Sequence, residues 1–342
     1  MHEAMLYRQL PGNRVACGLC AHGCQIDDGG RGVCQVRENR AGALYSLVYG
    51  RPIAANLDPI EKKPLFHFLP GTLSFSIATV GCNFQCGFCQ NWNISQMARE
   101  GGRIPGGDRK GNQAPARQIV DQALASGAAS ISYTYTEPTI YFEYAHDCMK
   151  LAVEVGLKNV FVSNGYQSAA CVEACRGLLH AANIDLKAMS DGFYRKHCKA
   201  RLRPVLDSLV NFRRAGVFLE ITTLLIPGEN DDPAELADLA GFIAAELGEG
   251  TPWHVSRFHP DYKVNHIGPT PVSGLEKALE IGREAGLHFV YAGNIPGHDS
   301  ESTKCPGCGG VAVSRQGYMV KESRLKNGAC PDCGREIPGV WR

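Results

Sequence analysis

Short runs of β-branched and aromatic residues alternate with amphipathic segments through the middle of the chain. The runs have the length of strands, and the segments between them repeat apolar residues at the spacing of a helix. The predicted strands are Ser76–Val80, Ile131–Tyr135, Asn159–Val162, Ala182–Leu186, Leu219–Leu225, His254–Phe258 and His288–Tyr291. The predicted helices are Ala116–Ser126, Tyr141–Val155, Ala169–His180, Val205–Ala215 and Pro233–Leu247. Such alternation is typical of βαβ units and of a parallel sheet.

Six or seven such repeats predict an α/β fold, specifically a partial (β/α)6-type TIM barrel over residues 71–295. We expect two small cysteine-rich appendages beside it, an N-terminal segment (1–70) and a C-terminal module (296–342). In a barrel of this kind the functional side chains lie in loops at the carboxyl ends of the strands. The residues that follow each predicted strand are therefore the first candidates for function.

The charge of the chain is balanced, with 35 Lys and Arg against 34 Asp and Glu and a net charge of +1. This balance does not favour nucleic acid, an acidic polymer or a membrane surface as a partner. No stretch approaches the roughly 18 uninterrupted apolar residues of a membrane span. Residues 1–13 lack the apolar core of a signal peptide. We expect a cytoplasmic protein with no nucleic-acid and no membrane partner.

Fifteen cysteines are unusual in a long chain without a secretion signal, and short spacings indicate metal ligands rather than disulfides. Four are scattered along the chain and are interpreted as buried thiols: Cys148, Cys171, Cys175 and Cys198. The others form three groups, one near each end of the chain and one directly after the first predicted strand.

The central group is Cys82, Cys86 and Cys89, with the spacing C-x₃-C-x₂-C. Three thiolates in so short a loop can wrap one face of a cuboidal iron–sulfur cluster. Three ligands for four irons leave one iron open, as catalysis requires, whereas a structural zinc site is closed by four ligands. The alternative is a partial zinc knuckle, but the position of the loop at a strand end favours the cluster.

This loop resembles the cluster loop of the radical S-adenosylmethionine (SAM) superfamily. The resemblance implies that Cys82, Cys86 and Cys89 hold a [4Fe-4S] cluster whose open iron is chelated by SAM. Reduction by a flavodoxin or ferredoxin would cleave SAM to methionine and a 5′-deoxyadenosyl radical, which abstracts hydrogen from a substrate. Phe88 matches the position that lies against the adenine.

Thr136 and Glu137 follow the second predicted strand. Radical SAM proteins carry a Gly-Gly-Glu-like motif here, so the resemblance implies that these residues bind the amino group of SAM. A carboxylate that accepts from an amine forms a charge-assisted hydrogen bond. Tyr135 and Thr136 replace the glycines, and this departure resembles the glycyl-radical activases, where Thr-Glu-Pro variants occur. The alternative is that Glu137 caps the helix that begins near Thr139.

Polar residues also follow the next two strands. Ser163 and Asn164 precede Gly165, whose lack of a side chain allows a ligand to approach the backbone; a simple turn is the alternative. Asp185 and Lys187 are two residues apart and so face one side of a strand. Their resemblance to the activases implies contacts with SAM, and a structural ion pair is the alternative.

The fifth and sixth strands carry a weaker signal. Activases often have a SAM-contacting Arg near Thr222, and this chain lacks it, so some SAM contacts must differ. His259 follows the sixth strand and matches a histidine that lies beside SAM in the activases. The alternative is a histidine satisfied within the core.

The C-terminal group consists of two C-P-x-C knuckles: Cys305, Cys308, Cys330 and Cys333. Two such knuckles about 20 residues apart predict a tetrahedral four-cysteine zinc ribbon, with rubredoxin-like iron as the second choice. The N-terminal group has the spacing C-x₂-C-x₃-C-x₉-C and comprises Cys17, Cys20, Cys24 and Cys34. Thiolate chemistry allows zinc or a second Fe-S cluster there. The resemblance to the activases slightly favours zinc, because activases with auxiliary clusters usually carry them after the cluster loop, whereas this group precedes it.

The whole chain, not only the barrel, resembles one subfamily, the AmmeMemoRadiSam-system radical SAM enzymes, which are related to pyruvate formate-lyase activating enzymes. The runs that carry this resemblance are Cys17–Cys24, Asp58–Phe68, Gln90–Trp92, Gly293–His298 and Ile337–Trp341. The resemblance implies Memo-like and AMMECR-like partner proteins and says little about the substrate.

Three functions are compatible with these motifs. The first is a radical SAM enzyme whose hydrogen donor is a small molecule or a protein other than a glycyl radical enzyme. The second is an activase that installs a glycyl radical on a partner enzyme. The terminal metal groups and the missing Arg near Thr222 favour the first. The third is a non-enzymatic zinc or Fe-S scaffold, which the balanced charge does not support.

Overall fold

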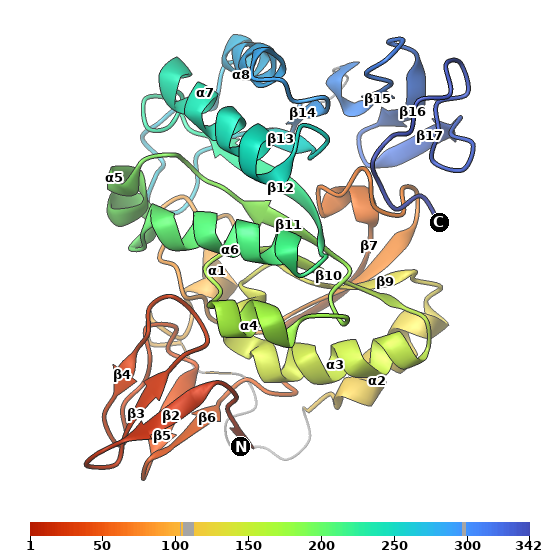
Figure 1. The fold of residues 1–342 in the computed structure, drawn as a ribbon. Helices are drawn as coiled ribbons and strands as arrows, with labels where there is room; N and C mark the ends of the chain where they lie inside the picture. Colours follow the sequence, from red (N-terminus) through yellow and green to blue (C-terminus); the bar gives the residue numbers. More distant parts are fainter. Residues whose placement is uncertain (103, 105–112, 296–298) are drawn as a thin grey trace.

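An eight-stranded sheet forms the centre of the protein in a computed structural model that describes residues 1–102, 104, 113–295 and 299–342 (Figure 1). The spatial order is β14-β13-β12-β11-β10-β9-β8-β7, with β7 antiparallel to β8 and all other pairs parallel. β7 and β14 are the two edges, so the barrel is partial. The strands are β7 Ala54–Pro59, β8 Leu73–Ala78, β9 Ser130–Tyr133, β10 Lys158–Ser163, β11 Ala181–Asp185, β12 Phe218–Leu225, β13 Trp253–Arg257 and β14 Val290–Gly293.

Helices follow the strands and pack against the sheet in chain order, from α2 and α3 on β9 to α8 on β13 and β14 (Figure 1). The α-helices are α1 Trp92–Ser95, α2 Ala116–Ala125, α3 Phe142–Glu154, α4 Ala169–Ala174, α5 Asp191–Phe193, α6 Leu202–Arg214, α7 Pro233–Phe242 and α8 Val272–Glu284. The short 3-10 and π helices are η1 Ile60–Lys62, η2 Pro138–Tyr141, η3 Tyr194–Cys198, η4 Ile243–Leu247 and η5 Asp299–Glu301. None of the helices in the described ranges is long and apolar enough to cross a membrane.

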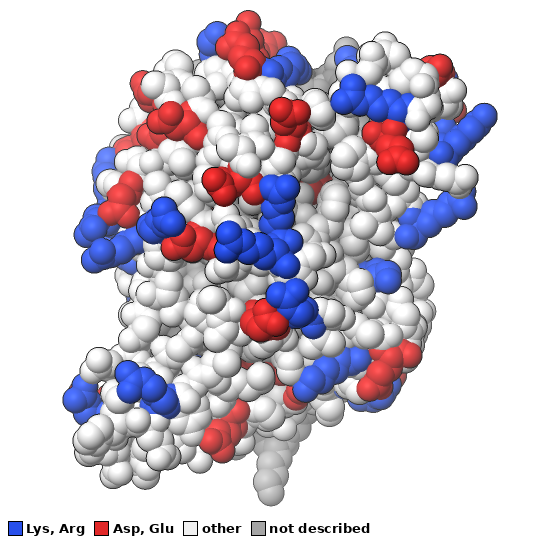
Figure 2. All heavy atoms as spheres, in the orientation of Figure 1, with Lys and Arg blue, Asp and Glu red and all other residues white. Residues whose placement is uncertain are grey.

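Small antiparallel sheets flank the barrel in the described part of the chain. Two lie in the N-terminal segment, in the orders β1-β6-β5 and β2-β3-β4, and one in the C-terminal module, β15-β16-β17 (Figure 1). Their strands are β1 His2–Glu3, β2 Tyr7–Leu10, β3 Arg14–Cys17, β4 Gln25–Ile26, β5 Arg37–Arg40, β6 Ala43–Ser46, β15 Thr303–Lys304, β16 Val311–Gln316 and β17 Met319–Ser323. Basic and acidic side chains are interspersed on the face that Figure 2 shows.

The predicted partial barrel is confirmed, and each predicted strand corresponds to one of β8 to β14. The edge strand β7 was not predicted, because Ala54–Pro59 lacks β-branched residues and forms a strand by pairing with β8. Its terminal proline is tolerated at a sheet edge. The predicted helix at 169–180 ends at Ala174, and Gly177 follows with a left-handed φ of 73°.

A buried carboxylate ties the C-terminal module and the chain before β8 to the sheet. Glu220 of β12 is fully buried and accepts hydrogen bonds from the backbone N–H of Phe66 (3.0 Å) and His67 (2.7 Å). Its Oε2 also lies 2.6 Å from His254 Nε2. Arg315 of β16 donates to Phe66 O, so this anchor extends into the C-terminal module.

We therefore expect Glu220→Gln to lower the free energy of unfolding by about 1–3 kcal/mol, because the amide NH₂ leaves buried N–H donors without an acceptor. Urea unfolding followed by circular dichroism measures the change. Glu280→Gln is the matched control, since Glu280 pairs with Lys277 at the surface and its loss should leave the unfolding midpoint almost unchanged. Equal unfolding midpoints for the two variants would contradict the anchoring role.

Candidate active site

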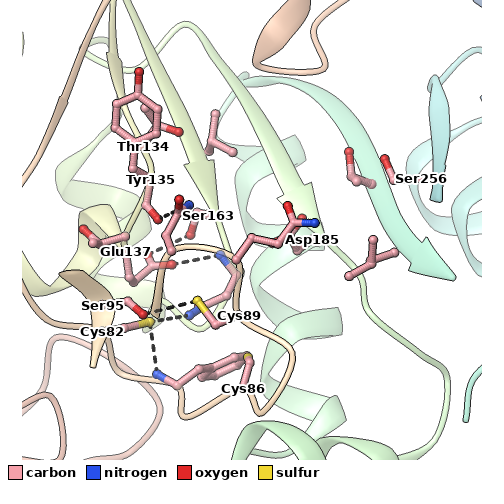
Figure 3. A pocket seen from close by; sticks show the side chains of 18 of the residues that line it. Cys82, Cys86, Cys89, Ser95, Thr134, Tyr135, Glu137, Ser163, Asp185 and Ser256 are labelled. Carbon is pink, nitrogen blue, oxygen red and sulfur yellow. Dashed lines mark hydrogen bonds between the residues drawn. The ribbon is translucent and has the colours of Figure 1, made fainter. Parts of the chain in front are cut away.

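A cavity of about 500 Å³ lies at the carboxyl ends of the parallel strands. This volume falls within the range usual for small-molecule sites. All three cysteines of the Cys82 loop line it, together with seven of the other predicted site residues: Phe88, Thr136, Glu137, Ser163, Asn164, Asp185 and Lys187. Figure 3 shows the cysteines together, with Glu137 and Ser163 on one side and Asp185 on another.

The Cys82 loop begins at Gly81, a position where the neighbouring chain leaves no room for a side chain. Gly81 has a φ of 101°, and a Cβ there would lie 2.8 Å from Val36 Cγ1 and 3.2 Å from Cys34 O. The loop therefore begins in tight contact with the N-terminal segment. On its other side, Gln85 N–H and Gly87 N–H donate to carbonyl groups of η3 at 3.0 and 3.1 Å.

Polar donors surround the sulfurs of the loop. Phe84 N–H donates to Cys82 Sγ at 3.3 Å, and the Asn164 amide lies 3.9 Å from the same sulfur. Ser95 Oγ lies 3.2 Å from Cys89 Sγ. Such donors stabilise thiolates, the form in which cysteine binds metal.

The thiols of Cys82 and Cys86 have different electrostatic surroundings. A hydrogen bond from the Cys198 thiol lowers the pKa of Cys86, and the charge of Lys187 acts in the same direction. Burial raises the pKa of Cys82, and the nearby charge of Glu137 adds to this effect. Cys198, interpreted from sequence only as a buried thiol, thus contacts Cys86 of the loop.

Glu137 is buried at the end of β9 and bound on several sides. Its Oε1 accepts from Thr139 N–H (3.0 Å), Thr139 Oγ1 (2.5 Å) and Ser163 Oγ (2.8 Å), and its Oε2 accepts from Asn164 N–H (2.9 Å). The contact with Thr139 N–H is the helix cap given above as the alternative role. Burial raises the pKa of Glu137 despite these donors.

Asn164 links this carboxylate to the cysteine loop. Its side chain donates to Asn83 Oδ1 at 2.7 Å, and Asn83 directly follows Cys82. Ser163 also accepts from the Gln167 amide at 2.7 Å. Gly165, by contrast, serves packing: its φ is 71°, and a Cβ there would lie 2.7 Å from Ile184 Cγ2.

Asp185 and Lys187 form an ion pair of 2.8 Å on the cavity wall. The Lys187 side chain is only 10% exposed, so its charge is poorly solvated. Burial alone would lower the pKa of Lys187, but the charges of Asp185, Cys86 and Cys198 outweigh it and raise that pKa. Lys187 therefore keeps its positive charge on the cavity wall.

Comparisons with known proteins agree with this arrangement. A family model described as the radical SAM superfamily matches residues 76–240. The chain is 43% identical over 339 residues to an uncharacterized protein, MJ0808, of Methanocaldococcus jannaschii, across 98% of this chain and 99% of that one. A second uncharacterized protein of that organism, MJ0674, is 23% identical over 285 residues, 80% of this chain and 76% of the relative.

The chain belongs to the radical SAM superfamily. It is a radical SAM enzyme, and the family implies a [4Fe-4S] cluster and SAM. A radical SAM methyltransferase from Sphaerobacter thermophilus shares the fold, with a TM-score of 0.51 and 15% identity over 67% of this chain and 68% of that one.

The residues of this radical SAM chain fit a cluster and SAM. Three soft thiol ligands line one cavity, as iron–sulfur clusters require, and N–H and O–H donors lie beside the sulfurs of Cys82 and Cys89. A carboxylate and an ammonium group of opposite charge line the same cavity. They suit the charged amino and carboxylate groups of the methionine part of SAM.

His259 does not reach this cavity. It lies two residues beyond β13 and is exposed, and it is not among the lining residues. The reason is local. Phe258 N–H donates to Thr270 Oγ1, and Thr270 N–H donates to Phe258 O. These bonds turn the chain away from the direction of β13 before it reaches His259. Ser256, within β13, lines the cavity instead.

Sequence reasoning missed several lining residues of the radical SAM cavity, among them Lys62, Lys63, Tyr135, Asn294 and Tyr318. Lys63 is buried and pairs with Asp58 at 2.6 Å, and burial lowers the pKa of Lys63 to about 8. The run Asp58–Phe68, which contains these lysines, had indicated only the subfamily resemblance and no role at the site. In the run Gly293–His298, residues 296–298 lie outside the described ones.

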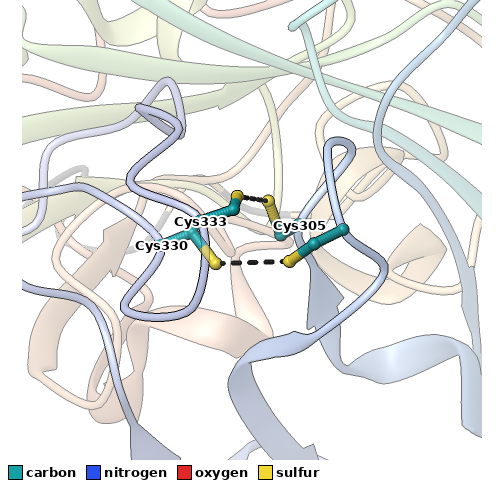
Figure 4. A group of neighbouring side chains, drawn as sticks. Cys305, Cys330 and Cys333 are labelled. Atoms are coloured by element: carbon teal, nitrogen blue, oxygen red, sulfur yellow. Dashed lines mark hydrogen bonds between the residues drawn. The ribbon is translucent and has the colours of Figure 1, made fainter.

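The C-terminal cysteines form a compact metal site (Figure 4). Their four sulfurs lie within 4.8 Å of one another, with Cys305 and Cys333 3.5 Å apart and Cys308 and Cys330 3.7 Å apart. A four-cysteine metal site is therefore present, as predicted. The sulfurs of the N-terminal cysteines are spread more widely and line a small cavity of their own.

The packing role of Gly165 makes a testable prediction. Gly165→Ala should lower the free energy of unfolding by about 1–3 kcal/mol more than Gly216→Ala, because only the former forces a methyl group into a filled core. Gly216 is the matched control, because its φ is 81° and a Cβ at that position would meet no atom within 4 Å. Urea unfolding without SAM measures both, and equal midpoints would assign Gly165 to ligand approach rather than packing.

Proposed function

We propose that this protein binds a [4Fe-4S] cluster through Cys82, Cys86 and Cys89 and uses SAM to abstract hydrogen from a substrate. The observation that carries the proposal is the convergence of these three thiols on one cavity with Glu137 and Lys187. When bound, the reduced cluster supplies one electron that splits SAM into methionine and a 5′-deoxyadenosyl radical.

Glu137 is the proposed acceptor for the amino group of SAM. A carboxylate has about four lone-pair sites, two on each oxygen, and Glu137 accepts four hydrogen bonds on Oε1 but only one on Oε2. Oε2 therefore keeps capacity for a further donor. Because the carboxylate is already fixed, binding the amine costs little additional side-chain conformational entropy.

Lys187 and Phe88 are proposed to orient the rest of SAM. The Lys187 ammonium, 5.9 Å from the centre of the Phe88 ring, lies close to the cysteine loop and can attract the carboxylate of SAM. Phe88 is buried and packs near Phe193, so its position is fixed. We assign to Thr136, Ser163, Asn164 and Asp185 further polar contacts with SAM.

The substrate is proposed to be a small molecule or a protein other than a glycyl radical enzyme, because the chain carries terminal cysteine groups and lacks the activase Arg near Thr222. A flavodoxin or ferredoxin would supply the electron, and Memo-like and AMMECR-like proteins would be partners. The Thr-Glu-Pro and Asp-Leu-Lys runs, which resemble activases, support the second candidate, an activase for a glycyl radical enzyme. We propose zinc for the C-terminal site, since its sulfur spacing suits a tetrahedral ion.

The test is product formation under anaerobic conditions. The protein reconstituted with iron and sulfide, reduced with dithionite and given SAM should form 5′-deoxyadenosine and methionine, measured by chromatography and mass spectrometry. Each of Cys82→Ala, Cys86→Ala and Cys89→Ala should abolish both products, because the cluster loses a ligand. Cys148→Ala, a buried thiol in α3, is the control that should retain activity. Product formation by the three loop variants would refute the proposal.

A further inference from the structure

The four N-terminal cysteines, Cys17, Cys20, Cys24 and Cys34, surround a small cavity between the N-terminal segment and the barrel. We call them the N-terminal cysteine group. The cavity has a volume of about 20 Å³, and the barrel contributes Asn83 and Ile140 to its wall. That volume is the space open to the centre of a water-sized sphere, so the void between the side chains is several times larger.

Sulfur spacing separates this group from the C-terminal one. A tetrahedral zinc with Zn–S bonds of about 2.3 Å holds its sulfurs about 3.8 Å apart. Only the C-terminal sulfurs, among the described residues, gather as a set of three or more within 4.8 Å. The N-terminal cysteine group is wider, and so are Cys82, Cys86 and Cys89. In a cluster each thiolate binds an iron at a different corner, so the sulfurs stand further apart.

Buried donors without a partner point into the same region. Arg37 and Asn83 line the cavity and are 2% and 1% exposed. Arg37 Nε and Asn83 Nδ2 have no hydrogen-bond partner. Burying such donors unpaired costs about 1–3 kcal/mol each, and sulfur acceptors of a cluster would satisfy them. Arg37 also lies 2.9 Å from Glu143, which holds it in place.

We infer that the N-terminal cysteine group binds a second iron–sulfur cluster rather than zinc. This inference goes beyond the proposed function and reverses the slight preference for zinc that the sequence suggested. The second site adjoins the first, because Asn83 lines the N-terminal cavity and is the neighbour of Cys82 in the chain. His22 Nε2, 2.8 Å from Asn83 O, adds a direct link between the two.

The test is the metal content of the full chain reconstituted anaerobically with iron, sulfide and zinc. The triple variant C82A/C86A/C89A should keep about half of the wild-type iron and sulfide if the second cluster is [4Fe-4S], or about a third if it is [2Fe-2S]. The electron paramagnetic resonance signal of the retained, reduced cluster should not change on addition of SAM. Zinc should stay at one ion per chain, at the C-terminal site.

A second variant makes the test independent of how the first one folds. Cys20→Ala combined with Cys24→Ala should lose the complementary share of iron and keep a signal that SAM perturbs, and Cys148→Ala should lose none. A triple variant without iron, whether it holds a second zinc or no further metal, would overturn the inference. A triple variant with all of the wild-type iron would keep a cluster at the N-terminal group but contradict the proposed function.

Discussion

The buried carboxylate of Glu137 is the interaction on which the geometry of the site depends. It receives donors from the helix that follows it and from Ser163 and Asn164 at the end of the neighbouring strand. Asn164 then reaches Asn83 and Cys82, so one anion fixes two strand ends and the cysteine loop together. A buried charge is tolerated only when it is bonded on several sides, which is why these polar residues cluster here.

Three groups of cysteines in one chain show how geometry distinguishes ligand sets of the same chemistry. The C-terminal sulfurs lie within 4.8 Å of one another, at a spacing that suits a single ion. The Cys82 loop and the N-terminal cysteine group are wider, and each lines a cavity. The contact of Gly81 with Val36 and Cys34 O brings these two wider groups side by side.

The sequence was sufficient for the barrel and for residues at strand ends. Cys82, Glu137 and Lys187 follow strands whose hydrophobic pattern is clear, and parallel strands place their carboxyl ends at one edge. His259 could not be placed, because the hydrogen bonds of Phe258 with Thr270, distant in sequence, redirect the chain. Lys63 reaches the cavity because it follows the edge strand β7, whose sequence is not strand-like. Tyr318 reaches it because the C-terminal module docks beside the barrel.

The central claim is that the three thiols of the Cys82 loop hold a cluster whose open iron binds SAM. Electron–nuclear double resonance of the reduced protein with SAM labelled with ¹⁵N at the amino group tests it most directly. The account predicts a nitrogen coupling of direct iron ligation in the wild type and none in Cys86→Ala. A reduced cluster in the wild type that shows no coupling to the label would contradict it.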